Sequence, residues 1–223
     1  MNEGGKEVRS KKFYGIIQVP YEQALQHIQT GDLFFCSGTS FLSEFIKSAS
    51  QSLMSHVAFL VKWQGRILVF ESVESAGVRI VPLAYYMKNY KNTGEKYKGR
   101  LYIARHEALI DSSFDRKKLN RMIGKALDSL NRNYDPAELV RILTRIKLGI
   151  GRHKENEEYI CSEFVDLCFE QIGIEFPKTK EGFIYPEHIA ADPRVYPMFE
   201  VVSEEPTESD KATAVTINPY AQR

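Results

Sequence analysis

The chain has 223 residues, of which 43% are hydrophobic and 12% aromatic, and this is enough apolar material for one ordinary domain with a sizeable core. Lys and Arg number 30 and Asp and Glu 29, so the net charge of +1 excludes a general attraction to nucleic acid or to an anionic membrane. No segment approaches the roughly 18 uninterrupted apolar residues of a membrane-spanning helix, so we expect no integral membrane segment.

Both ends of the chain are polar and show little periodicity. We expect residues 1–15 to be a flexible N-terminus, residues 16–202 to fold as one domain and residues 203–223 to be a polar C-terminal tail. Residues 1–12 contain no apolar segment of a secretory leader, which predicts a cytoplasmic protein; a chain trimmed of its leader would instead belong to the periplasm or cell envelope. The sequence leaves the oligomeric state open.

The folded body begins with short alternating elements. Residues 21–29 are expected to form a helix that ends at the turn Thr30-Gly31-Asp32, and the apolar run 33–36 follows as a buried strand. Apolar residues then recur at helical spacing between residues 41 and 49, which predicts a second helix with one buried face.

Two segments rich in β-branched and aromatic residues, 56–63 and 66–73, are separated by Gln64-Gly65, a two-residue hairpin loop. With this loop Trp63 faces Arg66, and by the same register Ala58 faces Glu71. His56 and Glu71 are then diagonal neighbours on one face of the sheet, with about 7–8 Å between their backbones. A shift of one residue in the loop would place them on opposite faces.

The second half of the body contains both kinds of element. Residues 78–82 and 101–105 are predicted strands of the same sheet, and the Tyr- and Lys-rich segment 85–100 is expected to be irregular. Apolar residues at helical spacing from 119 to 130 predict a helix. Residues 137–154 form a basic amphipathic stretch, which we expect to be a solvated helix or an insertion.

Cys161 lies where a polar loop passes into the last predicted helix, residues 160–172. At a helix N-terminus the exposed backbone N–H groups favour the reactive thiolate and can stabilise an oxyanion. The alternative is that Cys161, like Cys168, is a small buried hydrophobe. The three cysteines cannot all pair, and their spacing fits no zinc site, so we expect at least one free thiol and neither a metal nor another cofactor.

Glu71 lies on an otherwise apolar strand, and burying its carboxylate unpaired would cost several kcal/mol. His56 is its natural partner, because the pairing would leave the other ring nitrogen free to take a thiol proton. The alternatives are a structural strand-end histidine and, as the acid, Glu74 on the opposite face. Cys36, before a Ser/Gly/Thr loop, is a rival nucleophile, but it lacks the spacing of a P-loop or a nucleophile elbow.

Several strings together resemble the permuted papain-like hydrolases related to NlpC cell-wall peptidases, in particular the YiiX/YebB-like group. They are Gln29-Thr30-Gly31-Asp32-Leu33, Ser55-His56-Val57-Ala58, Val69-Phe70-Glu71-Ser72, Asn133-Tyr134-Asp135 and Tyr159-Ile160-Cys161-Ser162-Glu163. The histidine comes long before the cysteine, which is the order of the permuted topology. Ile160, where a polar or aromatic residue is often found, and the stretch 137–154 depart from the family pattern.

The resemblance implies an α+β fold in which helices pack on a small antiparallel barrel-like sheet. Carried onto matching positions, it makes Cys161 the nucleophile, His56 the general base and Glu71 the residue that orients the histidine. Ser55, Tyr134 and Glu163 are candidate substrate-binding residues; a structural turn for Tyr134 and a helix-dipole role for Glu163 are the simpler alternatives. The implied activity is that of an amidase or peptidase acting on a small peptide, such as one derived from a bacterial cell wall.

Two other functions stay open at this point. The lecithin-retinol acyltransferase group shares the order of histidine before cysteine, and this order also fits a lipid-directed acyltransferase or thioesterase. A catalytically idle binding module that retains the fold is the third possibility.

Overall fold

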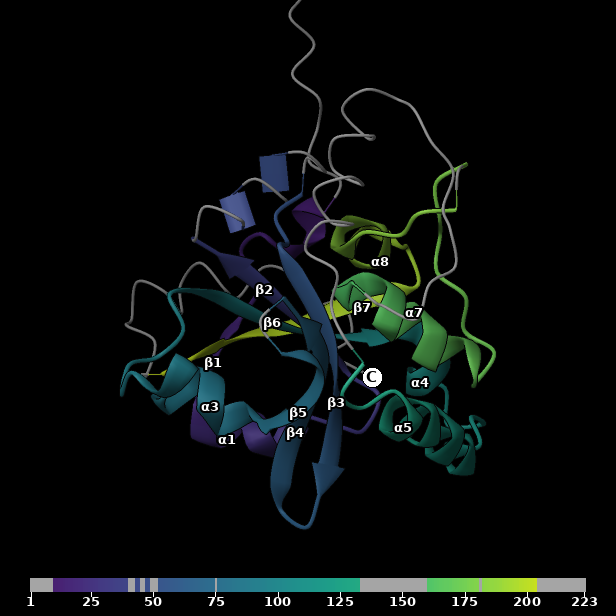
Figure 1. Ribbon diagram of the computed structural model, residues 1–223, viewed down its shortest axis with the longest axis horizontal. Helices are drawn as coiled ribbons and strands as arrows, with labels where there is room; N and C mark the ends of the chain where they lie inside the picture. Colours follow the sequence, from purple (N-terminus) through teal and green to yellow (C-terminus); the bar gives the residue numbers. More distant parts are fainter. Residues whose placement is uncertain are drawn as a thin grey trace, which may run out of the picture.

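The computed structural model describes residues 10–39, 43–44, 47–48, 52–74, 76–132, 160–180 and 182–203 (Figure 1). Strands, α-helices and short 3₁₀ helices (η) alternate along the chain. They are η1 (Lys11–Phe13), β1 (Gln18–Pro20), α1 (Tyr21–His27), β2 (Leu33–Gly38), β3 (His56–Trp63), β4 (Arg66–Val73), β5 (Gly77–Pro82), α3 (Leu83–Lys88), η2 (Tyr90–Asn92), β6 (Gly99–His106), α4 (Glu107–Ile110), η3 (Arg116–Lys118), α5 (Leu119–Asp128), α7 (Cys161–Glu170), α8 (Pro186–Ala191) and β7 (Val195–Val202).

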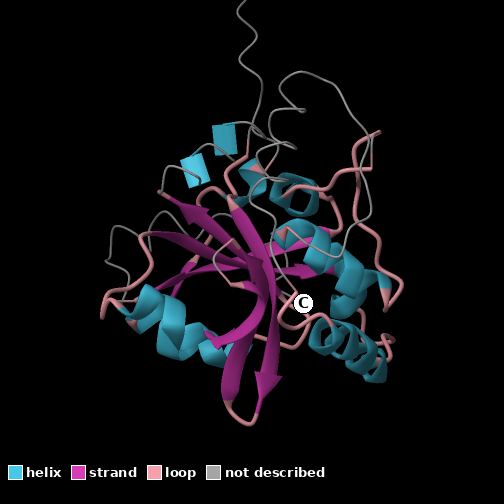
Figure 2. Cartoon of the chain, in the orientation of Figure 1, coloured by secondary structure: helices cyan, strands magenta, loops and turns pink. Residues whose placement is uncertain are grey.

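The strands form one seven-stranded sheet in the order β1-β7-β6-β2-β3-β4-β5. Every neighbouring pair is antiparallel except β1 and β7, which run parallel. Figure 2 shows the sheet, strongly twisted, with helices on both of its sides. The α+β class and the antiparallel sheet expected from the sequence are therefore confirmed.

Alternation along the strands separates two layers of core. On one face, Phe35, Val57 and Phe59 pack with residues of α5 and α7; on the other, Phe34 and Ala58 pack with residues of α1 and α3. Figure 1 shows α1 and α3 on one side of the sheet and α5 and α7 on the other. The sheet is thus buried on both faces, and helix α7, which begins at Cys161, lies against β3 and β4.

The predicted hairpin is confirmed in position and register. Trp63 pairs with Arg66 and Phe59 with Phe70, as the two-residue loop requires. Gln64 and Gly65 have φ values of 45° and 78°, the positive values that type I′ hairpin turns need. Because the register is not shifted by one residue in this loop, the side chains of His56 and Glu71 lie on the same face of the sheet, as predicted.

A buried ion pair explains the turn before β2. Gly31 has a φ of 95°, and a Cβ at this position would lie 2.7 Å from a methyl carbon of Leu109. Asp32 follows it, and its Oδ1 accepts a hydrogen bond from Arg105 Nε at 2.6 Å. Burial raises the pKa of Asp32, and the hydrogen bonds and charge of Arg105 oppose this effect. The turn therefore anchors the start of β2 to β6.

Some segments differ from the expectation. Residues 85–100 were expected to be irregular, and this is wrong in part: they include the end of α3, the whole of η2 and the start of β6. The rings of Tyr85, Tyr86 and Tyr90 pack on one another with centroids 5.3–5.6 Å apart, and Tyr86 also packs edge-on against Phe34 of β2, so that the sheet holds the segment in place.

Other strands and α-helices were not predicted at all, namely β1, α4, α8 and β7. Part of the segment predicted as a flexible N-terminus is packed, because Lys11–Phe13 form η1 and Phe13 is fully buried against Phe35 and Tyr102. Of the predicted helix between 41 and 49, the described residues 43–44 and 47–48 are helical. The basic stretch 137–154 and residues 204–223 of the predicted tail lie outside the described residues.

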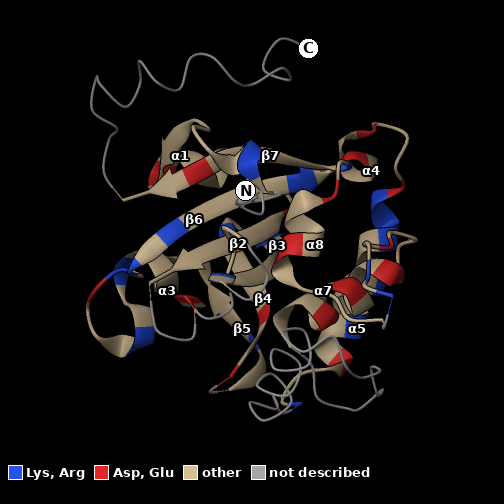
Figure 3. Ribbon diagram, turned by 90° about the horizontal axis from the view of Figure 1, so that it is seen from above, with Lys and Arg blue, Asp and Glu red and all other residues tan. Residues whose placement is uncertain are grey.

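Charged residues of both signs are spread over the described elements, as Figure 3 shows, in keeping with the net charge of +1. None of the helices in the described part of the chain is long and apolar enough to cross a membrane.

Candidate active site

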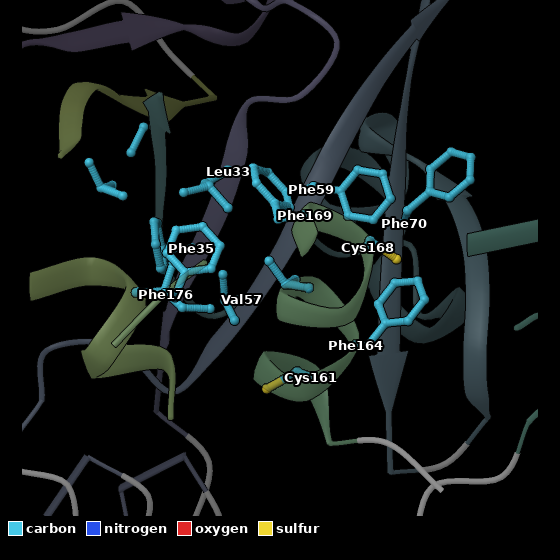
Figure 4. Close-up of a cluster of buried hydrophobic side chains, with 14 of the residues drawn as sticks. Leu33, Phe35, Val57, Phe59, Phe70, Cys161, Phe164, Cys168, Phe169 and Phe176 are labelled. Carbon is cyan, nitrogen blue, oxygen red and sulfur yellow. The ribbon is translucent and has the colours of Figure 1, made fainter. Parts of the chain in front are cut away.

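Cys161 is the first residue of α7 (Figure 4). Its side chain is almost fully buried, with 7% of the residue exposed. The residue before it, Ile160, is extended, and its N–H donates to Oε2 of Glu163 at 3.2 Å. The hydroxyl of Ser162 donates to the carbonyl of Ile184 at 2.8 Å, which fixes the first turn. The thiol therefore lies at a rigid helix N-terminus, where backbone N–H groups lack partners within the helix.

His56 is the first residue of β3, and it is the centre of the site. Its Nε2 lies 2.9 Å from Oε2 of Glu71, and the side chain is 16% exposed. Burial lowers the pKa of His56, but its hydrogen bonds with Cys161 and Glu71, together with the charges of these two residues, outweigh burial and raise the pKa to about 10. Since Nε2 is bonded to Glu71, Nδ1 is the ring nitrogen left for the thiol.

Glu71 is a fully buried carboxylate on β4. Besides His56, it accepts hydrogen bonds from Arg79 Nε on Oε1 at 2.8 Å and from the Tyr86 hydroxyl on Oε2 at 2.5 Å. Burial raises the pKa of Glu71, but its bonds to His56 and the charges of His56 and Arg79 dominate and lower the pKa below its usual value. The buried acid is therefore ionised and satisfied on both oxygens.

A pocket of about 680 Å³ opens beside His56. Its walls come mainly from the segment between the start of α3 and the start of β6, with single residues of β2, β3, β4 and β5, and they include Cys36, Ser55, Arg79, Tyr85, Tyr86, Tyr90 and Tyr97. Cys161 is not among the described residues that line it. The pocket has the volume of a small-ligand site and touches the histidine rather than the thiol.

The remaining predicted site residues have other contacts or cannot be placed. Ser55 is buried, and its hydroxyl accepts from Gly38 N–H at 3.0 Å and donates to the carbonyl of Cys36 at 3.1 Å, so it links β2 to the start of β3. Glu163 caps α7, as described above. Tyr134 lies outside the described residues. Glu74, the weaker candidate acid, is exposed just after β4.

The rival nucleophile Cys36 has a less favourable environment than Cys161. It lies inside β2 with no exposed surface, directly opposite His56. Burial, followed by the charges of Glu71 and Cys161, raises the pKa of Cys36 well above its usual value. Burial likewise raises the pKa of Cys168. All three cysteines are free thiols, as the spacing predicted for at least one of them.

Arg79 and Tyr86 are the contacts that sequence reasoning missed. Arg79 faces Glu71 directly in the β4–β5 ladder. The strand containing Arg79 was predicted, and a register that pairs Val73 with Gly77 would have paired Arg79 with Glu71. Tyr86 had no comparable signal, since α3 was not predicted.

A helix-terminal cysteine that contacts a histidine, itself bonded to a buried acid on an antiparallel sheet, is the arrangement of a papain-like hydrolase. Residues 27–216 match the family described as permuted papain-like amidase enzymes, YaeF/YiiX, C92 family. The chain belongs to this amidase family.

Among solved structures, the chain is similar to the crystal structure of the metalloprotein YiiX from Escherichia coli O157:H7. The two share 19% sequence identity with a TM-score of 0.54, over 80% of this chain and 98% of that chain, and the likeness is one of fold. YiiX is described as a metalloprotein, whereas the described residues of this chain include no group of three or more His, Cys, Asp and Glu that could hold a metal ion. None of the curated proteins matches this chain in sequence.

Proposed function

We propose that the protein is a cysteine amidase or peptidase that cleaves an amide bond of a small peptide through an acyl-enzyme on Cys161. The observation that carries the proposal is the position of the His56 ring, which contacts Cys161 on one side and the buried Glu71 on the other. Membership of an amidase family supports the type of bond. Cys161 is the nucleophile, His56 the general base and Glu71 the residue that orients His56.

In the first step, Nδ1 of His56 takes the proton of the Cys161 thiol, and the thiolate attacks the carbonyl carbon of the amide. The raised pKa of His56 favours the imidazolium that forms. Backbone N–H groups at the start of α7, that of Cys161 among them, stabilise the negative oxygen of the tetrahedral intermediate. His56 then returns the proton to the leaving nitrogen, and the C–N bond breaks to give the thioester and a free amine.

In the second step, His56 removes a proton from a water molecule, which attacks the thioester carbonyl. The C–S bond breaks, the carboxylic acid leaves, and the thiol regains its proton from His56. The pocket beside His56 is suited to hold part of the substrate close to the histidine. A peptide derived from a bacterial cell wall is the first substrate to try.

Labelling with iodoacetamide at neutral pH, read by peptide mass spectrometry, tests the nucleophile. We expect Cys161 to be labelled before Cys36 and Cys168, because burial raises the pKa of the latter two thiols and so keeps them in the unreactive protonated form. Labelling of Cys36 in preference to Cys161 would contradict the assignment. His56→Ala should slow labelling of Cys161, since the thiol then loses its base.

A panel of short peptides, including cell-wall peptides, and of acyl esters tests the reaction. We expect turnover of peptide amides by the wild-type chain and none by Cys161→Ala. Turnover of esters alone would favour a lipid-directed acyltransferase or thioesterase. If Cys161→Ala left every activity unchanged, a binding module without catalysis would be the better description.

A further inference from the structure

We propose that Arg79 and Tyr86 are positioning residues, which hold the carboxylate of Glu71 in the orientation that aligns the His56 ring with Cys161. This inference rests on the proposed function, since it takes Glu71 as the residue that orients His56. Neither Arg79 nor Tyr86 has a step in the mechanism above; both act through Glu71.

The contacts of the carboxylate restrict its rotation. Oε1 is 2.8 Å from both Nε and Nη2 of Arg79. Oε2 accepts a hydrogen bond from the Tyr86 hydroxyl at 2.5 Å and is hydrogen-bonded to Nε2 of His56 at 2.9 Å. Rotation of the carboxylate about its terminal bond would break the contacts at both of its oxygens. The plane of the carboxylate is therefore fixed by Arg79 on Oε1 and by Tyr86 on Oε2, and the direction in which Oε2 meets the imidazole is fixed with it.

Both donors are themselves held in place. Arg79 occupies the position on β5 directly opposite Glu71, and its guanidinium lies 5.2 Å from the ring centroid of Tyr85. Tyr86 is 2% exposed, and its ring packs edge-on against Phe34 at 5.0 Å and Tyr97 at 5.6 Å. Donors that are already ordered can orient the carboxylate without a further loss of conformational freedom.

The two residues make different contributions. Arg79 brings a positive charge, which is one of the influences that keep the buried Glu71 ionised against the effect of burial. Tyr86 is uncharged and contributes a directional hydrogen bond. Burial and the adjacent Glu71 raise the pKa of Tyr86 well above its usual value, so the hydroxyl stays protonated and donates a hydrogen bond to Oε2. Arg79 therefore adds to the effect of His56 in keeping Glu71 ionised, and Tyr86 helps to fix the orientation of its carboxylate.

A double-mutant cycle tests the inference. The rate constant for iodoacetamide labelling of Cys161 is measured in Arg79→Ala and Tyr86→Phe, each alone and combined with Glu71→Gln. We expect Arg79→Ala to slow labelling about tenfold or more and Tyr86→Phe several-fold, because the histidine is misaligned. In the Glu71→Gln background neither substitution should have a further effect, since no carboxylate remains to be held. Arg79→Lys should recover part of the rate, because an ammonium keeps the charge but not the two-point contact.

Two controls match these substitutions. Arg100→Ala removes another ion pair of the sheet, between Arg100 Nη2 and Glu200 Oε2 at 2.6 Å, and Tyr102→Phe removes another buried tyrosine hydroxyl. Both should stay within about twofold of the wild-type rate in either background. Thermal unfolding shows which variants fold. If Arg79→Ala does not fold, the nearly isosteric Tyr86→Phe still tests the inference.

Equal slowing by Arg79→Ala or Tyr86→Phe in both backgrounds would show a merely structural role and would overturn this inference alone. If Glu71→Gln by itself left the labelling rate unchanged, Glu71 would not orient His56 as the proposed function requires. The inference on Arg79 and Tyr86 would then also be wrong.

Discussion

Glu71 and Arg79 face each other across β4 and β5, and the guanidinium meets the buried carboxylate through two nitrogens, each 2.8 Å from Oε1. The other oxygen of the same carboxylate meets the His56 ring at 2.9 Å. One acid therefore joins a cation fixed in the sheet to the imidazole that contacts Cys161. An acid buried without partners would be neutral, and the hydrogen bond and charge of His56, followed by the charge of Arg79, lower the pKa of Glu71 and let this position hold a negative charge.

The charge of Glu71 should be visible in the titration of His56. Glu71→Gln keeps the shape of the side chain and removes its charge. Since the hydrogen bond and charge of Glu71 contribute to the raised pKa of His56, we expect this pKa to fall from about 10 toward its ordinary value. The rate of Cys161 alkylation, followed from neutral to about pH 11, should then show its basic transition at lower pH.

The control is Glu200→Gln, which removes the charge of another acid that pairs with an arginine of the sheet. It should leave the basic transition where it is in the wild type. A transition that stays in place in Glu71→Gln would mean that Glu71 does not act on His56.

The packing that positions α7 depends on Phe59. Its fully buried ring stacks on Phe70 and Phe164, with centroids 5.2 Å and 5.9 Å away, and so joins the hairpin to the helix that begins at Cys161. Phe59→Ala should lower the free energy of unfolding by about 3–5 kcal/mol, measured by chemical denaturation. Trp63→Ala, on the same strand but 54% exposed, should cost less than about 1 kcal/mol. Similar losses in both variants would show that Phe59 is not a core contact.

The sequence was most informative where the deciding contacts are local. The turn Gln64-Gly65 set the hairpin register, and this register predicted that an acid and a histidine share one face. Apolar periodicity located α5 and α7, and the change from polar loop to periodic helix placed Cys161 at a helix N-terminus, one residue after the predicted start at 160. These signals are carried by the turn itself and by the residues of each single element.

The features that were missed depend on contacts between distant segments. Strand β7 contains Pro197, which argues against a strand, but Pro197 lies beside a register shift between Ile103 and Ala104 of β6, where the regular pairing is interrupted. The packing of Tyr86 of α3 on Phe34 of β2 could not be predicted from a Tyr- and Lys-rich string. For the same reason Tyr86, which completes the surroundings of Glu71, was not foreseen.

The hairpin turn offers a test of backbone strain. Gly65 has a φ of 78°, and a Cβ built on it would meet no atom within 4 Å, so Gly65→Ala is strained only through its backbone. We expect a loss of about 1 kcal/mol in urea unfolding. Gln64, at a φ of 45°, is a non-glycine residue in the left-handed region, and Gln64→Asn should stabilise by a few tenths of a kcal/mol. A gain on Gly65→Ala would contradict this turn geometry.

The stability of the fold should fall in mild acid because of His106. This residue ends β6 and is 3% exposed, and its Nδ1 accepts the N–H of Ala108 at 3.2 Å. Burial, followed by the charge of Arg194, lowers the pKa of His106 from 6.5 to about 4, although Asp192 opposes the shift. Below pH 6.5 the histidine is protonated in the unfolded chain but stays neutral in the folded chain. The free energy of unfolding therefore decreases by roughly 3 kcal/mol in all as the pH falls toward 4.

His106→Asn separates this titration from the other acid-sensitive groups. The asparagine oxygen can still accept the N–H of Ala108, but it does not titrate, so urea unfolding at a series of pH values should show a much smaller loss between about pH 6.5 and 4. His27→Asn, which changes an exposed histidine at the end of α1, should keep the wild-type dependence. If His106→Asn lost as much stability over this range as the wild type, the ring of His106 would have to accept its proton in the folded state, and the buried neutral histidine would be disproved.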